Sequence, residues 1–95
     1  MDGARAVPRA SLAIVNAKGL HARASAKYVE TVERFDATAR VTRDGQTVYG
    51  DSIMGLLMLA AHQGTEIEVE TEGPEAADLL AALADLVANR FGEAD

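Results

Sequence analysis

The sequence contains no cysteine and no tryptophan, and aromatic residues make up only 4% of its 95 residues. Without cysteine the chain has no disulfide bond and no zinc or iron–sulfur site held by thiolates. A small domain that folds without disulfides is typical of a reducing compartment, so we expect a cytoplasmic protein. With so few aromatic residues, the single core is expected to consist mainly of Leu, Ile, Val, Ala and Met.

Long hydrophobic runs are also missing. No apolar stretch approaches the roughly 18 residues that a membrane-spanning helix needs. The first ten residues, MDGARAVPRA, lack the apolar segment of a secretory signal. We expect residues 1–9 to be a flexible arm, residues 10–92 to be one domain and residues 93–95 to be a tail.

Positive charge is scarce in the second half of the chain. Residues 51–95 carry one Arg against ten Asp or Glu, whereas residues 1–50 carry eight Lys or Arg against five Asp or Glu. An acidic chain with few aromatic residues is a poor nucleic-acid binder, which argues against that class of partner. The basic half can still present a surface that attracts anions.

The hydrophobic pattern predicts alternating strands and helices. Glu66, Glu68, Glu70 and Glu72 alternate with apolar residues, which indicates a strand with one solvated face. Asp44-Gly45 is a strong hairpin signal. The predicted class is α/β (α+β), a two-layer sandwich of an antiparallel sheet with helices on one face. We expect strands at 10–16, 37–43, 46–50 and 65–72, and helices at 22–34 (apolar face Ala22, Ala26, Val29 and Val32), 52–61 and 73–91, the last with Pro74 in its first turn.

The stretch Gly19-Leu20-His21-Ala22-Arg23 combines a turn, a histidine and an arginine at the start of a predicted helix. Backbone N–H groups at a helix start have no acceptor within the helix, and with the helix dipole they form a site for anions. A neutral imidazole is a good nucleophile, and Arg23 can bind phosphate oxygens. The pattern therefore makes His21 a candidate phosphoryl acceptor, with the Ala22 and Arg23 amides around the phosphate.

Simpler interpretations stay open for these residues. A lone histidine near a helix start is often a polar cap, and Arg23 can be an ordinary solvated side chain. His62 is the only other histidine, and no cluster has the spacing of metal ligands, so we expect no metal and no cofactor. The chain also lacks paired carboxylates and a glycine-rich phosphate loop, which argues against a small-molecule enzyme.

The segment 52–61 is the second unusual stretch. Its apolar residues cover more than one helix face, so part of them should be exposed and available to a partner. Packing in the core, with methionine as filler, is the alternative. Ser52 is expected to be the N-cap of this helix, and a phosphate there would repel an acidic partner from the apolar surface.

Three segments resemble the HPr family, the small histidine phosphocarriers of the phosphoenolpyruvate-dependent phosphotransferase system: GLHAR at 19–23, SIMG at 52–55 and QGTEIEVETEG at 63–73. The resemblance runs from about residue 10 to residue 91. It implies an open-faced sandwich in the order β-α-β-β-α-β-α, with four strands ordered 1-4-2-3 and three helices on one face.

The resemblance also implies roles for individual residues. His21 would accept a phosphoryl group on Nδ1 from phosphorylated enzyme I and pass it to an enzyme IIA-type acceptor, without turnover of its own, and Arg23 would hold the phosphoryl oxygens. Ser52 matches a regulatory serine that an HPr kinase/phosphorylase modifies in some bacteria. The carrier is expected to be a monomer. The implied docking surface contains Leu20, Ala26, Lys27, Ile53, Met54 and Leu57.

Two departures from the family pattern stand out. Ala24 occupies the position where the family usually has proline, so the helix start is expected to be looser and to keep one more free N–H. The N-terminal arm is longer than usual. The sugar-uptake branch and the nitrogen-related regulatory branch share the histidine motif, and we lean towards the regulatory branch. A regulatory module that docks partners without passing phosphate is the alternative function.

Overall fold

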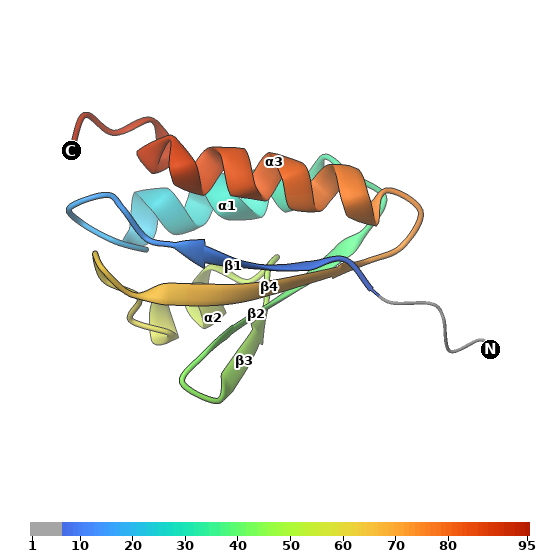
Figure 1. Ribbon diagram of the computed structural model, residues 1–95, viewed down its shortest axis with the longest axis horizontal. Coiled ribbons are helices and arrows are strands. Elements are labelled where there is room, and N and C mark those ends of the chain that lie inside the picture. The colour runs from blue at the N-terminus through green and yellow to red at the C-terminus, as the bar shows by residue number, and fades with distance from the viewer. Residues whose placement is uncertain (1–6) are drawn as a thin grey trace.

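A four-stranded antiparallel sheet in the order β1-β4-β2-β3 forms one layer. Helices α1 and α3 lie side by side on one of its faces (Figure 1), and α2 packs against α1 and β3. This confirms the predicted class and strand order. The computed structural model describes residues 7–95, so most of the predicted arm, residues 1–6, lies outside the described part. The elements are β1 (Arg9–Ala13), α1 (Ala22–Glu33), β2 (Thr38–Arg43), β3 (Gln46–Tyr49), α2 (Ile53–Met58), β4 (Glu66–Glu72), α3 (Ala76–Ala88) and a final 3₁₀ turn (Arg90–Gly92).

Strand β4 lies in the middle of the sheet and carries the predicted alternation. Ile67, Val69 and Thr71 are buried under the helices, whereas Glu66, Glu68 and Glu72 are exposed. It pairs with β1 and β2, and Val69 lies opposite Val41 in β2. The period of two therefore places one row of side chains in the core and the other on an open face.

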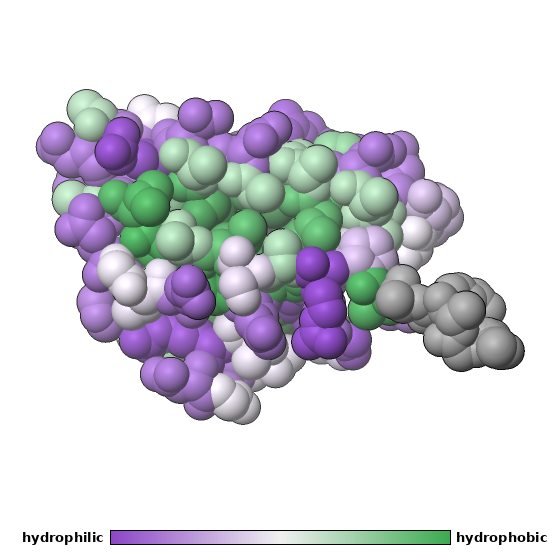
Figure 2. Space-filling view, viewed as in Figure 1, coloured by the Kyte–Doolittle hydropathy of each residue, from purple (hydrophilic) through white to green (hydrophobic). Residues whose placement is uncertain are grey.

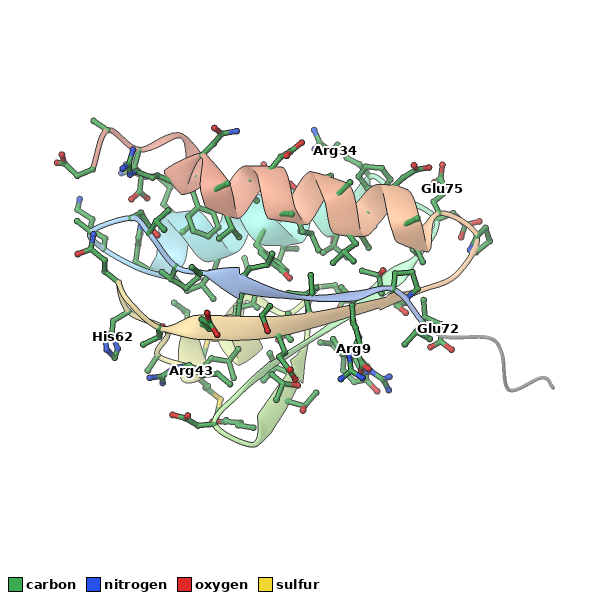
Figure 3. The ribbon with its side chains drawn as sticks, viewed as in Figure 1. Arg9, Arg34, Arg43, His62, Glu72 and Glu75 are labelled. Carbon is green, nitrogen blue, oxygen red and sulfur yellow. The ribbon has the colours of Figure 1, made fainter. Side chains whose placement is uncertain are left out.

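The open face carries ion pairs between neighbouring strands. Arg9 lies on the side of the sheet away from α1 and α3, as Figure 3 shows, and its guanidinium is 3.5 Å from the carboxylate of Glu70. Arg40 also contacts Glu70, at 3.2 Å. These pairs are solvated, so each contributes only about 0–1 kcal/mol. In the view of Figure 2, apolar surface gathers instead along the contact between α3 and β1.

The turn between β2 and β3 confirms the predicted hairpin. Asp44 and Gly45 have φ values of 50° and 78°, and Arg43 pairs directly with Gln46. Two positive φ values are what a two-residue turn of this kind requires, which explains the Asp-Gly pair.

The buried face of α1 differs in part from the predicted one, since Val29 and Val32 are buried as predicted but the two alanines are not. Ala22 is exposed and Ala26 is half-buried, whereas the core side is formed by a neighbouring register that includes fully buried Ala24 and Tyr28. Alanine carries little hydrophobic signal, so an alanine-rich helix fits more than one face. The buried residues of this helix are Ala24, Ser25, Tyr28, Val29, Thr31 and Val32.

The predicted last helix, 73–91, was too long at both ends. Pro74 precedes α3, which begins at Ala76, because Gly73 adopts a φ of 121°. At the other end the helix stops at Ala88, and Arg90 and Phe91 have φ values of 57° and 55°. The chain therefore reverses its course, and Phe91 enters the core from this reversal rather than from the helix.

The remaining elements are also shorter than predicted. Helix α2 covers Ile53–Met58 instead of 52–61, because Leu59 ends it and Ala60 has a φ of 52°. Strand β1 ends at Ala13, so Val15 and Asn16 belong to the loop before α1. None of the helices within residues 7–95 is both long and apolar enough to cross a membrane.

Candidate functional site

His21 is the N-cap residue of α1. Its backbone is extended, with φ −75° and ψ −178°, and its carbonyl accepts the first helical hydrogen bond from Ser25 N–H at 2.8 Å. Its side chain makes no capping bond to the helix. The N–H groups of the next three residues therefore have no acceptor inside the helix and remain available to an anion.

The loop before His21 is fixed on both sides. Leu20 N–H donates to the Ala61 carbonyl at 2.9 Å, and the Ser25 hydroxyl donates to the Leu20 carbonyl at 3.2 Å. Gly19 has a φ of 63°, and a Cβ on it would lie only 2.8 Å from the Cα of His62. Only glycine fits such a close approach in this conformation, so Gly19 sets the position of His21.

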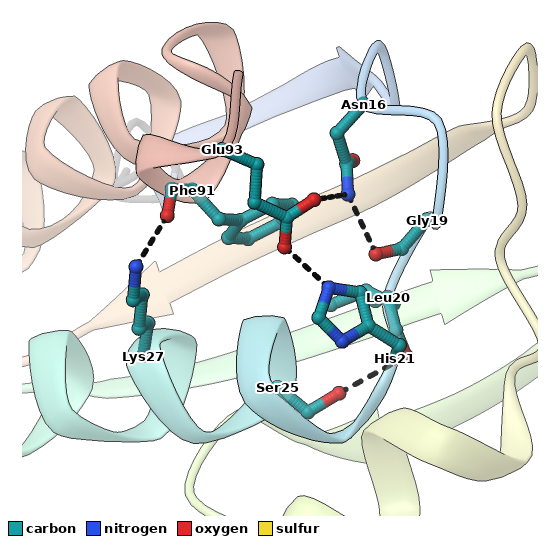
Figure 4. Close-up of polar contacts among 8 residues, drawn as sticks. All are labelled: Asn16, Gly19, Leu20, His21, Ser25, Lys27, Phe91 and Glu93. Atoms are coloured by element: carbon teal, nitrogen blue, oxygen red, sulfur yellow. Dashed lines mark hydrogen bonds and ion pairs between the residues drawn. The ribbon is translucent and has the colours of Figure 1, made fainter. Parts of the chain in front are cut away.

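The imidazole of His21 contacts a carboxylate from the far end of the chain. Its Nε2 lies against Oε2 of Glu93, as Figure 4 shows. Both side chains are largely buried, with exposed fractions of 25% and 16%. The other oxygen of Glu93, Oε1, accepts a hydrogen bond from Asn16 Nδ2 at 3.0 Å. The same amide donates to the Gly19 carbonyl at 2.9 Å, so Asn16 connects the tail to the loop.

The tail that carries Glu93 is held at several points. Lys27 Nζ donates to the Phe91 carbonyl at 2.7 Å, and Ala17 N–H donates to a backbone oxygen of Asp95 at 2.7 Å. The Phe91 side chain is buried, with 1% of its surface exposed. Glu93, in the segment 93–95 that was assigned to a tail from the sequence, is therefore held against His21.

The charges at this end of the molecule have mixed signs. A hollow of about 260 Å³ beside the tail is lined by Ala17, Lys18, Arg23, Glu93, Ala94 and Asp95. Partial burial raises the pKa of the Glu93 carboxyl, but hydrogen bonds from Asn16 and His21, with electrostatic attraction from His21 and Lys18, outweigh it and lower the pKa overall. Glu93 is therefore an ionised hydrogen-bond acceptor at neutral pH.

Ser52 occupies the start of α2, as predicted. Its hydroxyl accepts a hydrogen bond from Gly55 N–H at 3.0 Å, which is a side-chain N-cap. Three residues of this short helix are exposed, Ile53 by 40%, Met54 by 68% and Met58 by 64%, whereas Leu56 is fully buried. Both sequence interpretations of this segment therefore apply, since part of it is core and part is free surface.

The predicted docking residues have different accessibilities. Ile53 and Met54 are exposed, and Ala26, Lys27 and Leu57 are half-buried. Leu20 is buried in the core, with 5% of its surface exposed, so its side chain offers little to a partner. Lys27 has a structural contact that the sequence did not indicate, because it binds the tail through Phe91.

Sequence reasoning missed Asn16 and Glu93. They lie 5 and 72 positions from His21 and belong to a loop and an aperiodic tail, so no hydrophobic pattern points to them. Nothing resembling a metal site accompanies them: no three His, Cys, Asp or Glu side chains between residues 7 and 95 are placed to hold an ion.

Comparison with known proteins extends over nearly the whole chain. A family model described as "PTS HPr component phosphorylation site" matches residues 8–89. The phosphocarrier protein HPr of Neisseria meningitidis is 48% identical over 85 residues, which cover 90% of this chain and 96% of the relative. The HPr of Pseudomonas aeruginosa is 42% identical over 90 residues, 94% of this chain and all of the relative.

Solved structures agree with this assignment. The crystal structure of HPr from Bacillus anthracis has a TM-score of 0.83 and 37% identity, covering 87% of this chain and 99% of the other. HPr-C-His from Thermoanaerobacter tengcongensis has a TM-score of 0.87 and 35% identity, covering 90% and 97%. The chain belongs to the HPr family of histidine phosphocarrier proteins of the phosphoenolpyruvate-dependent phosphotransferase system.

Proposed function

We propose that His21 accepts a phosphoryl group on Nδ1 from phosphorylated enzyme I and passes it to an enzyme IIA-type protein. One observation carries this proposal: the side chain of His21, the N-cap of α1, makes no capping bond, and its Nδ1 has no hydrogen-bond partner among residues 7–95. The ring nitrogen is therefore free to react beside amides that lack acceptors. We place this activity in the cytoplasm and assign it to the monomer.

The surroundings of His21 suit a phosphoryl group. The backbone N–H groups of Ala22 and Arg23 lie at the positive end of α1 and would donate to phosphoryl oxygens. Arg23 is exposed and borders the same hollow as Glu93, so its guanidinium is available for the transferring group. Transfer of this kind depends mainly on positioning and charge stabilisation, so the carrier needs no turnover of its own.

The exposed apolar surface of α2 supplies a docking site for these partners. Ile53 and Met54 are exposed by 40% and 68%, and α2 packs against α1, which carries His21. Methionine side chains adapt to different partner surfaces, as a carrier with a donor and an acceptor requires. The half-buried residues Ala26, Lys27 and Leu57 are assigned to the margin of this surface.

Intact mass spectrometry after incubation with phosphoenolpyruvate and a cognate enzyme I tests the phosphoryl transfer. We expect the mass to increase by one phosphoryl group, which is lost in acid, and no increase in His21→Ala. His62→Ala is the matched control and should behave like the parent. A phosphoryl group that persists in His21→Ala would overturn the assignment.

Ser52 is proposed as a regulatory phosphorylation site for an HPr kinase/phosphorylase. A phosphate on its hydroxyl would lie beside exposed Ile53 and Met54, where its charge would weaken docking of an acidic partner. We expect Ser52→Asp to accept phosphate from enzyme I more slowly than Ser52→Ala. Equal rates for the two variants would exclude this mechanism.

Docking without phosphoryl transfer is the second candidate function, and the exposure of Met54 and Met58 favours it. The two functions differ in which residue they need. If His21→Ala leaves the cellular phenotype intact and Met54→Asp abolishes it, docking is the function. If His21→Ala abolishes the phenotype instead, the result supports the phosphocarrier. Identifying the protein that accepts the phosphoryl group would then distinguish the sugar-uptake branch from the regulatory branch.

A further inference from the structure

We propose that Glu93 is a positioning residue, which holds the proton of His21 on Nε2 and thereby leaves the lone pair of Nδ1 free for phosphorus. This inference rests on the proposed role of His21 and adds a residue and a proton position to it. Glu93 touches His21 and not the transferred group, so it acts through the histidine.

The contact itself determines the tautomer. An ionised carboxylate has only acceptor sites, and a neutral imidazole carries its proton on one nitrogen. Nε2 facing Oε2 of Glu93 without a proton would place two lone pairs against each other, so the proton belongs on Nε2. Nδ1 is then the unprotonated nitrogen, as a nucleophile must be.

Glu93 is itself held in place, which separates this contact from a casual surface pair. Asn16, which is fully buried, donates to Oε1 of Glu93 and to the carbonyl of Gly19. The tail is fixed further by Lys27 and by the buried ring of Phe91 (Figure 4). Asn16 thus spans the tail and the loop that sets His21, and the carboxylate and the imidazole have a fixed relative position.

The other charged groups at this end act in different directions. Lys18 favours the ionised form of Glu93, and Arg23 lines the same hollow, whereas Asp95 adds negative charge from the tail. Lys27 is engaged with the Phe91 carbonyl, and His62 is exposed on the neighbouring loop. Among the carboxylates of residues 7–95, only that of Glu93 is hydrogen-bonded to the His21 ring.

The transfer step follows from this arrangement. The lone pair of Nδ1 forms a bond to phosphorus while the bond from phosphorus to the nitrogen of a phosphohistidine donor breaks, and its electron pair stays on the donor. The Nε2 proton does not move, so the phosphorylated ring of His21 is cationic. Glu93 stabilises that cation, and a protonated ring is the better leaving group in the next transfer.

Glu93→Gln tests the proposal. Asp95→Asn is the matched control, because it removes a side-chain carboxylate of the tail that does not contact His21. The Gln amide can donate to Nε2, so we expect the ¹⁵N spectrum of the ring to shift towards the Nδ1–H tautomer. We also expect transfer from enzyme I to slow at least about tenfold. Hydrolysis of the phosphorylated form should slow at neutral pH, because its ring loses the Nε2 proton more readily.

Several outcomes separate this proposal from the role of His21. If the parent chain accepts no phosphoryl group, the proposed function fails. If the parent is phosphorylated and Glu93→Gln matches it in tautomer, transfer rate and hydrolysis profile, only the positioning role fails. A slower variant with an unchanged tautomer and profile also overturns it, because that result indicates a structural defect. Glu93→Asp keeps the negative charge, so it should partly restore the dependence of phosphohistidine hydrolysis on pH.

Discussion

The two helix starts at His21 and Ser52 are both occupied by N-cap residues, but they use their side chains differently. Ser52 bonds to the amide of Gly55 and satisfies its own helix. His21 turns away from its helix towards Glu93 and leaves the first amides of α1 without a side-chain acceptor. The side-chain cap of Ser52 thus stabilises α2, whereas the start of α1 has no side-chain cap and its free amides can bind an anion.

Replacing the histidine cap of α1 by a serine cap, as in α2, should have the largest effect. We expect His21→Ser and His21→Ala to lose phosphoryl acceptance entirely, because neither has a nucleophilic ring. Both variants also lose the contact with Glu93, so the difference between their stabilities measures the effect of a side-chain cap alone. The serine variant should be more stable by about 1 kcal/mol. Intact mass and thermal unfolding measure the two effects. Equal stability would show that the α1 amides do not need a cap.

Removing the Arg23 guanidinium at the start of α1 should have the next largest effect, on the rate of phosphoryl transfer. We expect Arg23→Ala to slow transfer from enzyme I by about 100-fold, since one charged donor to the transferring group is lost. Arg34→Ala, at the other end of the same helix, is the control and should retain the parent rate. Quenched-flow measurement of phosphorylated carrier gives both rates. Equal slowing in the two variants would point to general charge instead of a local contact.

The loop that positions His21 can be disturbed without touching the ring. In Gly19→Ala the methyl group meets the backbone of Ala61 and His62 at a φ of 63°. We expect a loss of about 2 kcal/mol or more in the free energy of unfolding. Gly45→Ala has open space around its Cβ and a φ of 78°, so it shows the cost of the backbone strain alone. The difference between the two variants in the free energy of unfolding, measured with denaturant, gives the cost of the steric contact at Gly19.

At the Ser52 start the effect should fall on stability alone. Ser52→Ala removes the bond to Gly55 N–H, and we expect a loss of about 1 kcal/mol. Phosphoryl acceptance from enzyme I should stay at the parent rate, because His21 and its contacts are unchanged. Chemical denaturation and transfer kinetics on the same sample check both statements. A slower transfer would show that the two helix starts are coupled through α1 and α2.

The smallest expected effect is the pH dependence of the tail. The pKa of Glu93 is lower in the folded chain than the ordinary value of 4.5. Its ionised form therefore stabilises the fold above that pH, and this contribution is lost as the pH falls through the folded pKa. We expect Glu93→Gln to unfold at a lower temperature than the parent at pH 7, with a difference that shrinks below about pH 4.5. A difference that stays constant with pH would assign the effect to packing.

The sequence predicted the parts of the molecule that depend on local patterns. The alternation along β4 and the Asp44-Gly45 turn are short-range features, and the structure confirms both. The cap at Ser52 and the position of His21 at a helix start also follow from a few adjacent residues. The resemblance to the HPr family supplied the strand order, which no periodicity contains.

The errors share a physical cause, which is that tertiary contacts override local signals. The periodic pattern continued through Phe91, but the chain leaves the helix after Ala88 and still buries that ring. Alanine residues left the face of α1 ambiguous. Glu93 has no local signature, because its partners Asn16 and His21 come from the other end of the sequence.

The hydrogen bond from Ala17 N–H to a backbone oxygen of Asp95 offers a way to measure motion of the tail. This amide is protected only while the tail lies on the loop, whereas Ile14 N–H, bonded to the Thr65 carbonyl, belongs to the contact between β1 and the start of β4. Hydrogen exchange at the two amides therefore reports different openings, local release of the tail and disruption of the sheet. The protection factor of the Ala17 amide gives the free energy of releasing the tail, and its ratio to that of Ile14 gives the difference between the two opening free energies, without any substitution.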